Sequence, residues 1–129
     1  MSRYASLFDI NGRTAVITGG TRGIGEMIAT GFVDLGVKTY VTSRKADACA
    51  DIEEKLGCTA TPFDLSKTGD VEAFAAWLAE REDKIDILIN NAGASAPMKD
   101  AWDEAAWERA HQLNFAASRQ VSAAIVPGM

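Results

Sequence analysis

Cysteine and histidine are both scarce in this chain of 129 residues. Its two cysteines, Cys49 and Cys58, have a spacing that fits no metal-binding or redox motif. Its one histidine, His111, adds no second ligand of the kind that metal sites use. We therefore expect no metal site and two thiols that stay reduced.

Long apolar runs and basic runs are missing as well. No apolar stretch approaches the length that spans a bilayer, and residues 1–11 lack the basic start and apolar middle of a signal peptide. The net charge is −5, and no polybasic segment overrides it. Nucleic acids and anionic membranes are therefore disfavoured as partners, and we expect a cytoplasmic protein.

The most informative feature that is present is a glycine-rich turn, Thr18–Gly25, between two regular patterns. Before it, residues 14–17 form a short run rich in branched side chains, which is typical of a strand buried on both faces of a parallel sheet. After it, apolar residues recur at helical spacing as far as Gly36: Ile24, Met27, Ile28, Phe32 and Leu35. The sequence predicts a strand, a glycine turn and a helix.

Three glycines of this turn, Gly19, Gly23 and Gly25, suit a phosphate site. A tight turn needs positive φ, and a Cβ atom would keep the backbone away from a bound pyrophosphate. The helix that follows directs unpaired N–H groups and the positive end of its dipole at those phosphates. A glycine-rich loop that only reverses the chain direction is the alternative.

Positive charge follows the next predicted strand, residues 37–42, about 20 residues past the turn. An acidic residue at this point would bind the ribose 2′-hydroxyl of NAD. The chain instead has Thr42-Ser43-Arg44-Lys45, and Arg22 in the turn can approach the same group. Arginine and hydroxyl groups suit a 2′-phosphate, so the sequence favours NADP. The alternative is that Arg44 and Lys45 are solvated charges that open the next helix.

The rest of the chain alternates helices and strands. The patterns predict, in order, a helix over 46–56 ended by Gly57, a strand over 59–63, a helix from Thr68, a strand over 85–89, a loop over 92–99 and a long helix over about 101–126. This alternation indicates an α/β fold with a doubly wound parallel sheet, the Rossmann arrangement, in the spatial order 3-2-1-4. The cofactor is then expected at the carboxyl ends of the strands, where Gly19, Arg44, Asp64 and Asn91 fall.

Two motifs in this order carry a family resemblance. The turn resembles the Thr-Gly-x-x-x-Gly-Ile-Gly signature of short-chain dehydrogenases/reductases, and Asn90-Asn91-Ala92-Gly93 resembles the second signature of that family. The resemblance covers essentially the whole chain and implies an NADP-dependent reductase, similar to 3-ketoacyl reductases and to reductases of rhamnolipid-type pathways. It also implies that residues 1–129 are the NADP-binding amino-terminal half of a single domain.

The resemblance implies roles for residues at matching positions. Together with the turn and the basic segment, it gives these expected cofactor contacts: Gly19, Thr21, Arg22, Gly23 and Ile24 at the pyrophosphate, Ser43 and Arg44 at the 2′-phosphate, Asp64 and Leu65 at the adenine, and Asn91, Ala92 and Gly93 along the ribose side. Asn114 matches the catalytic asparagine of the family. The implied partners are a small carbonyl or alcohol substrate and further copies of the chain in a homo-oligomer.

The family's acid chemistry uses a tyrosine, a lysine four residues later and a serine, and this set is missing here. Tyr4 and Tyr40 are the only tyrosines, neither has that lysine, and Tyr40 is expected to pack in the fold. We therefore expect the serine, tyrosine and lysine on sequence beyond residue 129. The alternative is a short, non-catalytic nucleotide-binding or interaction module, in which the strand over 85–89 would be an apolar sheet edge.

Three ring-bearing residues of the predicted long helix have structural interpretations. His111 is expected to pack or to lie on the surface, and Trp102 and Trp107 are expected to be packing or interface residues.

Overall fold

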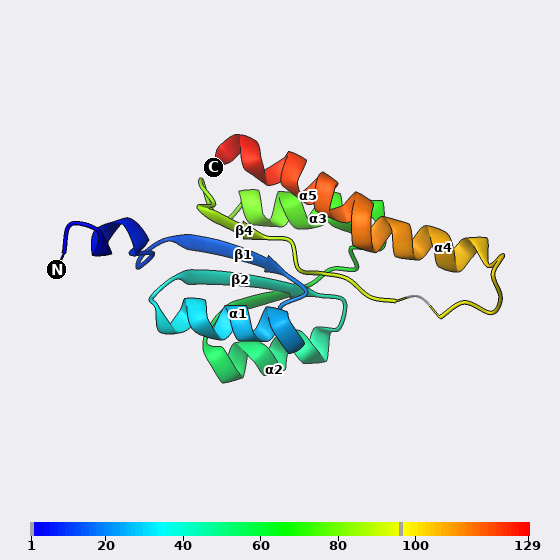
Figure 1. The fold of residues 1–129 in the computed structure, drawn as a ribbon, viewed down its shortest axis with the longest axis horizontal. Helices are drawn as coiled ribbons and strands as arrows, with labels where there is room; N and C mark the ends of the chain where they lie inside the picture. Colours follow the sequence, from blue (N-terminus) through cyan, green and yellow to red (C-terminus); the bar gives the residue numbers. More distant parts are fainter. Residues whose placement is uncertain (1, 96) are drawn as a thin grey trace.

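The computed structural model describes residues 2–95 and 97–129, and its centre is a four-stranded parallel sheet (Figure 1). The strands are β1 (Thr14–Thr18), β2 (Lys38–Ser43), β3 (Thr59–Pro62) and β4 (Ile87–Ile89). They lie in the order β3-β2-β1-β4, which confirms the predicted order. Because β1 pairs with both β2 and β4, it is central and its five residues are all buried.

Helices cover both faces of this sheet, as the ribbon shows (Figure 1). One face carries α1 (Gly23–Asp34) and α2 (Ala46–Leu56), and the other carries α3 (Thr68–Ala79) and α5 (Ala117–Ile125), while α4 (Glu104–His111) extends beyond the ends of the strands. Short 3-10 turns at Ala5–Phe8 and Val126–Gly128 lie near the two ends of the chain. Gly57 ends α2 with φ +71°, the left-handed conformation expected of a terminating glycine.

Strand alternation creates two separate cores, one on each face. Val16 and Tyr40 project to the side of α3 and α5, where Phe74 is fully buried. Ile17 and Val41 project to the side of α1 and α2. The strands therefore need apolar residues in succession, which explains the run that predicted them.

The predicted long helix is present as a continuous helical run, but it starts later and contains a π-helical turn. It begins at Glu104 rather than near residue 101, and a π-helical turn over Gln112–Ala116 separates α4 from α5. The apolar spacing across this turn stays close to helical, so the sequence pattern does not reveal the extra residue. Residues 92–95 and 97–99 form the predicted loop, and residue 96 of that prediction lies outside the described part of the chain.

The apolar residues of α1 do not all face the core. Ile28 and Phe32 pack against it, whereas Ile24, Met27 and Leu35 are 70%, 73% and 57% exposed. The buried positions of α1 are the small residues Gly25 and Ala29, because the helix lies close to the sheet there. Helical spacing therefore predicted the helix correctly but not its buried face.

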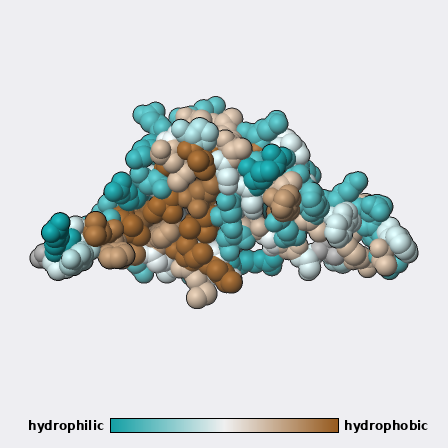
Figure 2. Space-filling model, turned by 45° about the horizontal axis from the view of Figure 1, so that its top comes forward, coloured by the Kyte–Doolittle hydropathy of each residue, from teal (hydrophilic) through white to brown (hydrophobic). Residues whose placement is uncertain are grey.

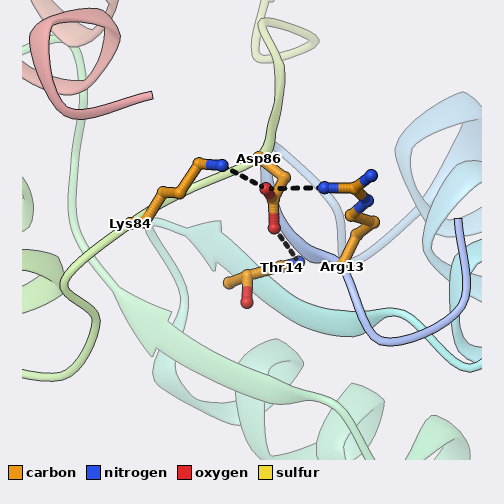
Figure 3. Close-up of polar contacts among 4 residues, drawn as sticks. All are labelled: Arg13, Thr14, Lys84 and Asp86. Atoms are coloured by element: carbon orange, nitrogen blue, oxygen red, sulfur yellow. Dashed lines mark hydrogen bonds and ion pairs between the residues drawn. The ribbon is translucent and has the colours of Figure 1, made fainter.

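Asp86 ties the amino ends of β1 and β4 together (Figure 3). Its carboxylate accepts the N–H of Thr14 at 2.9 Å and pairs with Lys84 at 3.2 Å and Arg13 at 3.5 Å. The Thr14 N–H and these cations hold the pKa of Asp86 below its usual value. The predicted strand over 85–89 is therefore shorter, since Ile85 and Asp86 precede the β4 ladder.

Tyr40 packs in the fold, as expected from the sequence. It is 4% exposed, its ring lies edge-on to Trp77, and its hydroxyl donates to Glu82 Oε1 at 2.6 Å. Lys38 also pairs with Glu82, and its hydrogen bond is the largest of the effects that lower the pKa of Glu82. This cluster anchors the end of α3 to β2.

The two cysteines are buried on the α2 side of the sheet. Burial raises the pKa of both thiols, so they are neutral near pH 7. Within the described ranges, no three His, Cys, Asp or Glu side chains gather as metal ligands would. No helix of those ranges has the length and apolar character of a membrane span.

Candidate functional site

The glycine turn after β1 leads directly into the amino end of α1. Gly19 and Gly23 have φ of +68° and +57°, so both occupy conformations that favour glycine. The N–H groups of Gly19 and Gly20 donate to Thr42 O on β2 at 2.8 and 3.3 Å, which fixes the turn to the sheet. These two amides are therefore engaged within the protein.

The first amides of α1 are in a different position. Arg22 is the N-cap residue, its backbone is extended, and no side chain caps the helix. The N–H groups of Gly23, Ile24 and Gly25 therefore point out of the helix end without an intrahelical acceptor. Glu26 places a negative charge in the first turn, but Lys55 of α2 pairs with it. This helix end can bind an anion.

A hydrogen-bonded clamp joins the glycine turn to the segment after β4. Thr18 Oγ1 accepts the N–H groups of Asn91 and Ala92, both at 3.0 Å. In return, Asn91 Nδ2 donates to Thr18 O at 3.1 Å and to Gly19 O at 3.0 Å. The two expected motifs, more than 70 positions apart, are thus in direct contact.

The close approach in this clamp explains two of the glycines. A Cβ atom on Gly25 would collide with Gly19 O and with Asn91 Nδ2. A Cβ atom on Gly19 would lie 2.9 Å from the Cα atom of Ala92. Gly25 is therefore required by the packing of the turn rather than by positive φ.

The basic segment lies at the carboxyl end of β2. Ser43 is half-buried, and its Oγ accepts the N–H of Lys45 at 3.5 Å. Arg44 is exposed, as is Arg22 at the start of α1. Thr21 is half-buried in the turn between them. Both guanidinium groups are thus exposed to solvent near the carboxyl ends of the strands.

Asp64 and Leu65 follow β3 at the same edge. Asp64 is half-buried, and burial alone would disfavour its charge. Hydrogen bonds from Ser66, together with the charges of Lys67 and Arg44, outweigh that penalty and lower the pKa of Asp64. Asp64 is therefore ionised near neutral pH and lies within the field of Arg44.

Leu65 lies beside Asp64 with its side chain in the core. It is 4% exposed and belongs to the core cluster on the α3 side, so its side chain is directed away from the site. Its main-chain carbonyl accepts from Gln112 Nε2 at 3.5 Å. Within the described ranges no protein group accepts from its N–H. Any contact of Leu65 with a ligand must therefore use this amide.

Asn114 lies in the π-helical turn and reaches the loop after β4. Its Oδ1 accepts the N–H of Ala94 at 2.9 Å, and its Nδ2 donates to Ala94 O at 2.8 Å and to Ala110 O at 2.9 Å. Gly93 packs so closely that a Cβ atom would lie 2.8 Å from Asn114 Oδ1. The side chain thus holds the loop that continues the second motif, and Ala92 packs against the core beside it.

Two residues that shape this edge are not among those expected from the sequence. Thr18 is the centre of the clamp, and Ser66 donates both its hydroxyl and its N–H to Asp64 Oδ1. Thr18 is the first residue of the glycine-turn signature, but the sequence did not indicate its contacts with the second motif. An aspartate followed two residues later by serine after a strand is typical of a local side-chain turn, which was the available signal for Ser66.

Trp102, which precedes α4, and Trp107 and His111, which belong to it, take no part in the clamp. Trp102 and Trp107 are 85% and 60% exposed, so neither packs in the core of this chain, and of the two expected roles the interface role fits this exposure. His111 is exposed, and its ring lies 5.3 Å from that of Phe115. An open hollow of about 470 Å³ runs along this helix and contains no residue of the glycine turn: its lining is Ser66, Ala105, Trp107, Glu108, Arg109, His111 and Gln112.

Comparison with known proteins decides the family. The family model described as short chain dehydrogenase matches residues 13–129. The chain belongs to the short-chain dehydrogenase family. This short-chain dehydrogenase is 40% identical over 112 residues to a rhamnolipids biosynthesis 3-oxoacyl-[acyl-carrier-protein] reductase of Pseudomonas aeruginosa, an alignment that covers 83% of this chain and 44% of the relative.

Solved structures of relatives have the same fold. The NADP active-site complex of Pseudomonas aeruginosa RhlG superposes with a TM-score of 0.85 and 36% identity, over 99% of this chain and 51% of the other. A 7 alpha-hydroxysteroid dehydrogenase complexed with NADH and 7-oxo glycochenodeoxycholic acid gives a TM-score of 0.87 and 29% identity, over 100% and 52%. This short-chain dehydrogenase chain therefore spans about half the length of the relatives it matches.

Proposed function

We propose that this short-chain dehydrogenase binds NADP and reduces a carbonyl group to an alcohol, with residues 1–129 forming the amino-terminal, cofactor-binding half of its domain. The single observation that carries the proposal is the pairing of an uncapped helix end after the glycine turn with exposed arginines at the same sheet edge. An uncapped end suits a diphosphate, and nearby arginines suit a further phosphate.

The pyrophosphate site is proposed at the amino end of α1. The amides of Gly23 and Ile24 would donate to phosphate oxygens, with the Thr21 hydroxyl beside them and Gly19 keeping the turn tight. Arg22 adds positive charge at the N-cap position. The net charge of −5 on residues 1–129 makes this local field necessary, because their average charge repels anions.

The choice of NADP over NAD is proposed to rest on Arg44. It follows β2 directly, and residues 42–45 contain no carboxylate that would repel a 2′-phosphate. Ser43 offers a hydroxyl beside it. The NADP complex of RhlG supports this choice, and the NADH complex of the hydroxysteroid dehydrogenase is an example of a relative with the other nucleotide.

Adenine is proposed to lie against the end of β3. Asp64 offers a carboxylate acceptor and the Leu65 N–H offers a donor, the pair that the edge of adenine requires. Asn91, Ala92 and Gly93 lie beyond β4 and would line the ribose side. The Asn114 side chain keeps this segment in place through Ala94, so we propose a role for it near the reacting groups.

The cofactor would supply a hydride to the substrate carbonyl, and residues beyond 129 would supply the proton. The 40% identity to a 3-oxoacyl-[acyl-carrier-protein] reductase supports a 3-oxoacyl substrate. The exposed Trp107 and Phe115 support a homo-oligomer, because apolar rings on a helix face are typical of subunit contacts.

The substitution Arg44→Asp tests the cofactor assignment. It should weaken NADPH binding roughly 10- to 100-fold, because charge-assisted hydrogen bonds to the 2′-phosphate are lost, and should leave NADH binding nearly unchanged. Arg3→Asp is the matched control, since it makes the same charge change at an exposed residue near the amino terminus. Titration of each variant with both nucleotides, followed by fluorescence, provides the measurement. Equal losses for the two nucleotides would refute the role of Arg44.

The alternative is a short nucleotide-binding or interaction module without catalysis. The apolar edge formed by β4 favours it only if another chain covers that edge. Intact mass and the reading frame after Met129 separate the two functions. A downstream Tyr-x-x-x-Lys supports the reductase, and an immediate stop codon supports the module.

A further inference from the structure

Ser66 contacts the proposed adenine site through Asp64. Its hydroxyl donates to Asp64 Oδ1 at 2.6 Å, and its main-chain N–H donates to the same oxygen at 3.0 Å. Two donors on one oxygen determine the rotation of the carboxylate. The second oxygen, Oδ2, receives no hydrogen bond from a protein group within residues 2–95 and 97–129.

The backbone of Asp64 is fixed as well. Its N–H donates to Asp70 Oδ2 at 2.7 Å, and its carbonyl accepts the N–H of Lys67 at 3.0 Å. Both partners belong to the start of α3, which packs on the core through Val71. The carboxylate thus has a rigid backbone and one engaged oxygen.

Asp64 Oδ2 and the Leu65 N–H together form an acceptor beside a donor. The six-membered ring of adenine presents the opposite pair, an amino group that donates and a ring nitrogen that accepts. A 6-oxo purine such as hypoxanthine has a carbonyl oxygen and a protonated nitrogen at these positions. It would therefore oppose an acceptor with an acceptor and a donor with a donor.

We infer that Ser66 is a positioning residue for base selection: it holds Asp64 so that Oδ2 accepts from the amino group of adenine and repels the oxygen of a 6-oxo purine. The inference rests on the proposed NADP site and assigns to Ser66 the preference for its base. Without the hydroxyl, the carboxylate keeps only the N–H of Ser66 and can rotate, so both oxygens are shared between conformations.

The test compares two nucleotides that differ only in the base, NADPH and its hypoxanthine analogue. Each is titrated into the full-length protein and its variants, with binding followed by nicotinamide fluorescence. The wild type should prefer NADPH. Ser66→Ala should reduce that preference about 3- to 10-fold by loss of one hydrogen bond to a charged group, Ser66→Thr should restore it, and the control Ser6→Ala should leave it unchanged.

A second pair of variants gives a readout that a merely structural role would not move. In Asp64→Asn, the Ser66 donors should keep the amide oxygen in the place of Oδ1, so that the amide nitrogen replaces Oδ2 and donates to hypoxanthine. Preference should then shift toward the hypoxanthine analogue. In the double variant Asp64→Asn with Ser66→Ala, the amide can flip, and the shift should be smaller.

The outcomes separate the inference from the proposed function. If the wild type binds neither nucleotide, the proposed function fails and the inference fails with it. If NADPH binds but the wild type shows no preference, or Ser66→Ala weakens both nucleotides equally, the NADP site stands and the inference is overturned. An unchanged preference in Ser66→Ala overturns it too. If Ser66→Ala does not fold, the test is the shift of preference in Asp64→Asn, and the inference is overturned when that shift is absent.

Discussion

Two aspartates, one at the amino ends of the strands and one at the carboxyl ends, accept backbone N–H groups and have different roles. Asp86 lies at the amino edge, where its carboxylate joins the starts of β1 and β4 and pairs with two cations. Asp64 lies at the carboxyl edge, where one oxygen is engaged and the other is not. Asp86 therefore stabilises the fold, whereas Asp64 retains an acceptor for a ligand.

The lowered pKa of Asp86 predicts a pH-dependent contribution to stability. An aspartate with a folded pKa below its unfolded value of about 3.9 stabilises the fold above that value, and the contribution disappears as the pH falls through the folded pKa. Asp86→Asn should therefore lower the free energy of unfolding at pH 7, and its difference from wild type should shrink toward pH 2.5. Urea denaturation across this range measures it.

Asp51→Asn is the matched control for this prediction, because it removes an exposed carboxylate from α2. Its effect on the free energy of unfolding should be small at every pH in the series. If Asp86→Asn were as harmless as this control at pH 7, the hydrogen bond to Thr14 and the two ion pairs would not stabilise the fold.

At the scale of elements, the sequence predicted the features that depend on adjacent residues but not the contacts between distant segments. The glycine turn and the strand–helix alternation were visible because each depends on a few adjacent residues. The clamp from Thr18 to Asn91 was not, since it joins residues 73 positions apart, and nothing in either segment specifies a partner. The π-helical turn that carries Asn114 was missed because one extra residue scarcely changes an apolar repeat.

Two glycines of α1 offer a test of how the turn is built. Gly25 has no room for a Cβ atom between Gly19 O and Asn91 Nδ2, whereas Gly31 has open space around its Cβ position. Gly25→Ala should destabilise the fold by about 1–3 kcal/mol and abolish nucleotide binding. Gly31→Ala should stabilise it by about 0.5–1 kcal/mol through higher helix propensity and leave binding intact.

Thermal unfolding and NADPH titration of the two alanine variants provide the measurement. Both variants add one methyl group to the same helix, so a difference between them reports the local packing at the turn. Comparable stability and binding in the two variants would mean that the glycine turn can move away from the Asn91 side chain at little cost.

At the scale of the whole molecule, the strand order leaves β4 as an unpaired edge strand beside a packed core. β4 pairs with β1 on one side only, and its three residues are all half-buried. Leu88 packs toward α3 and α5, and Ile89 toward α1 and α2, so the strand is apolar on both faces. A hydrophobic patch covers the part of the molecule where Figure 1 draws β4 (Figure 2). An edge of this kind is a template for pairing with another strand.

The chain of residues 1–129, expressed alone, should therefore self-associate through β4 as its concentration rises into the micromolar range. Ile87→Lys places a charge on the unpaired strand and should reduce the association, because a lysine that must stay solvated opposes strand pairing. Leu35→Lys is the control, an equally polar change at a 57% exposed residue next to α1. Size-exclusion chromatography with light scattering measures both.

In the full-length protein the same substitution should act in the opposite direction. If a further strand of the chain pairs with β4, Ile87 is enclosed there, and Ile87→Lys should lower the midpoint of thermal unfolding while Leu35→Lys leaves it nearly unchanged. If Ile87→Lys reduced self-association of residues 1–129 and also left the thermal midpoint of the full-length protein unchanged or higher, β4 would be an edge strand in the complete protein too. The interaction-module alternative requires that result.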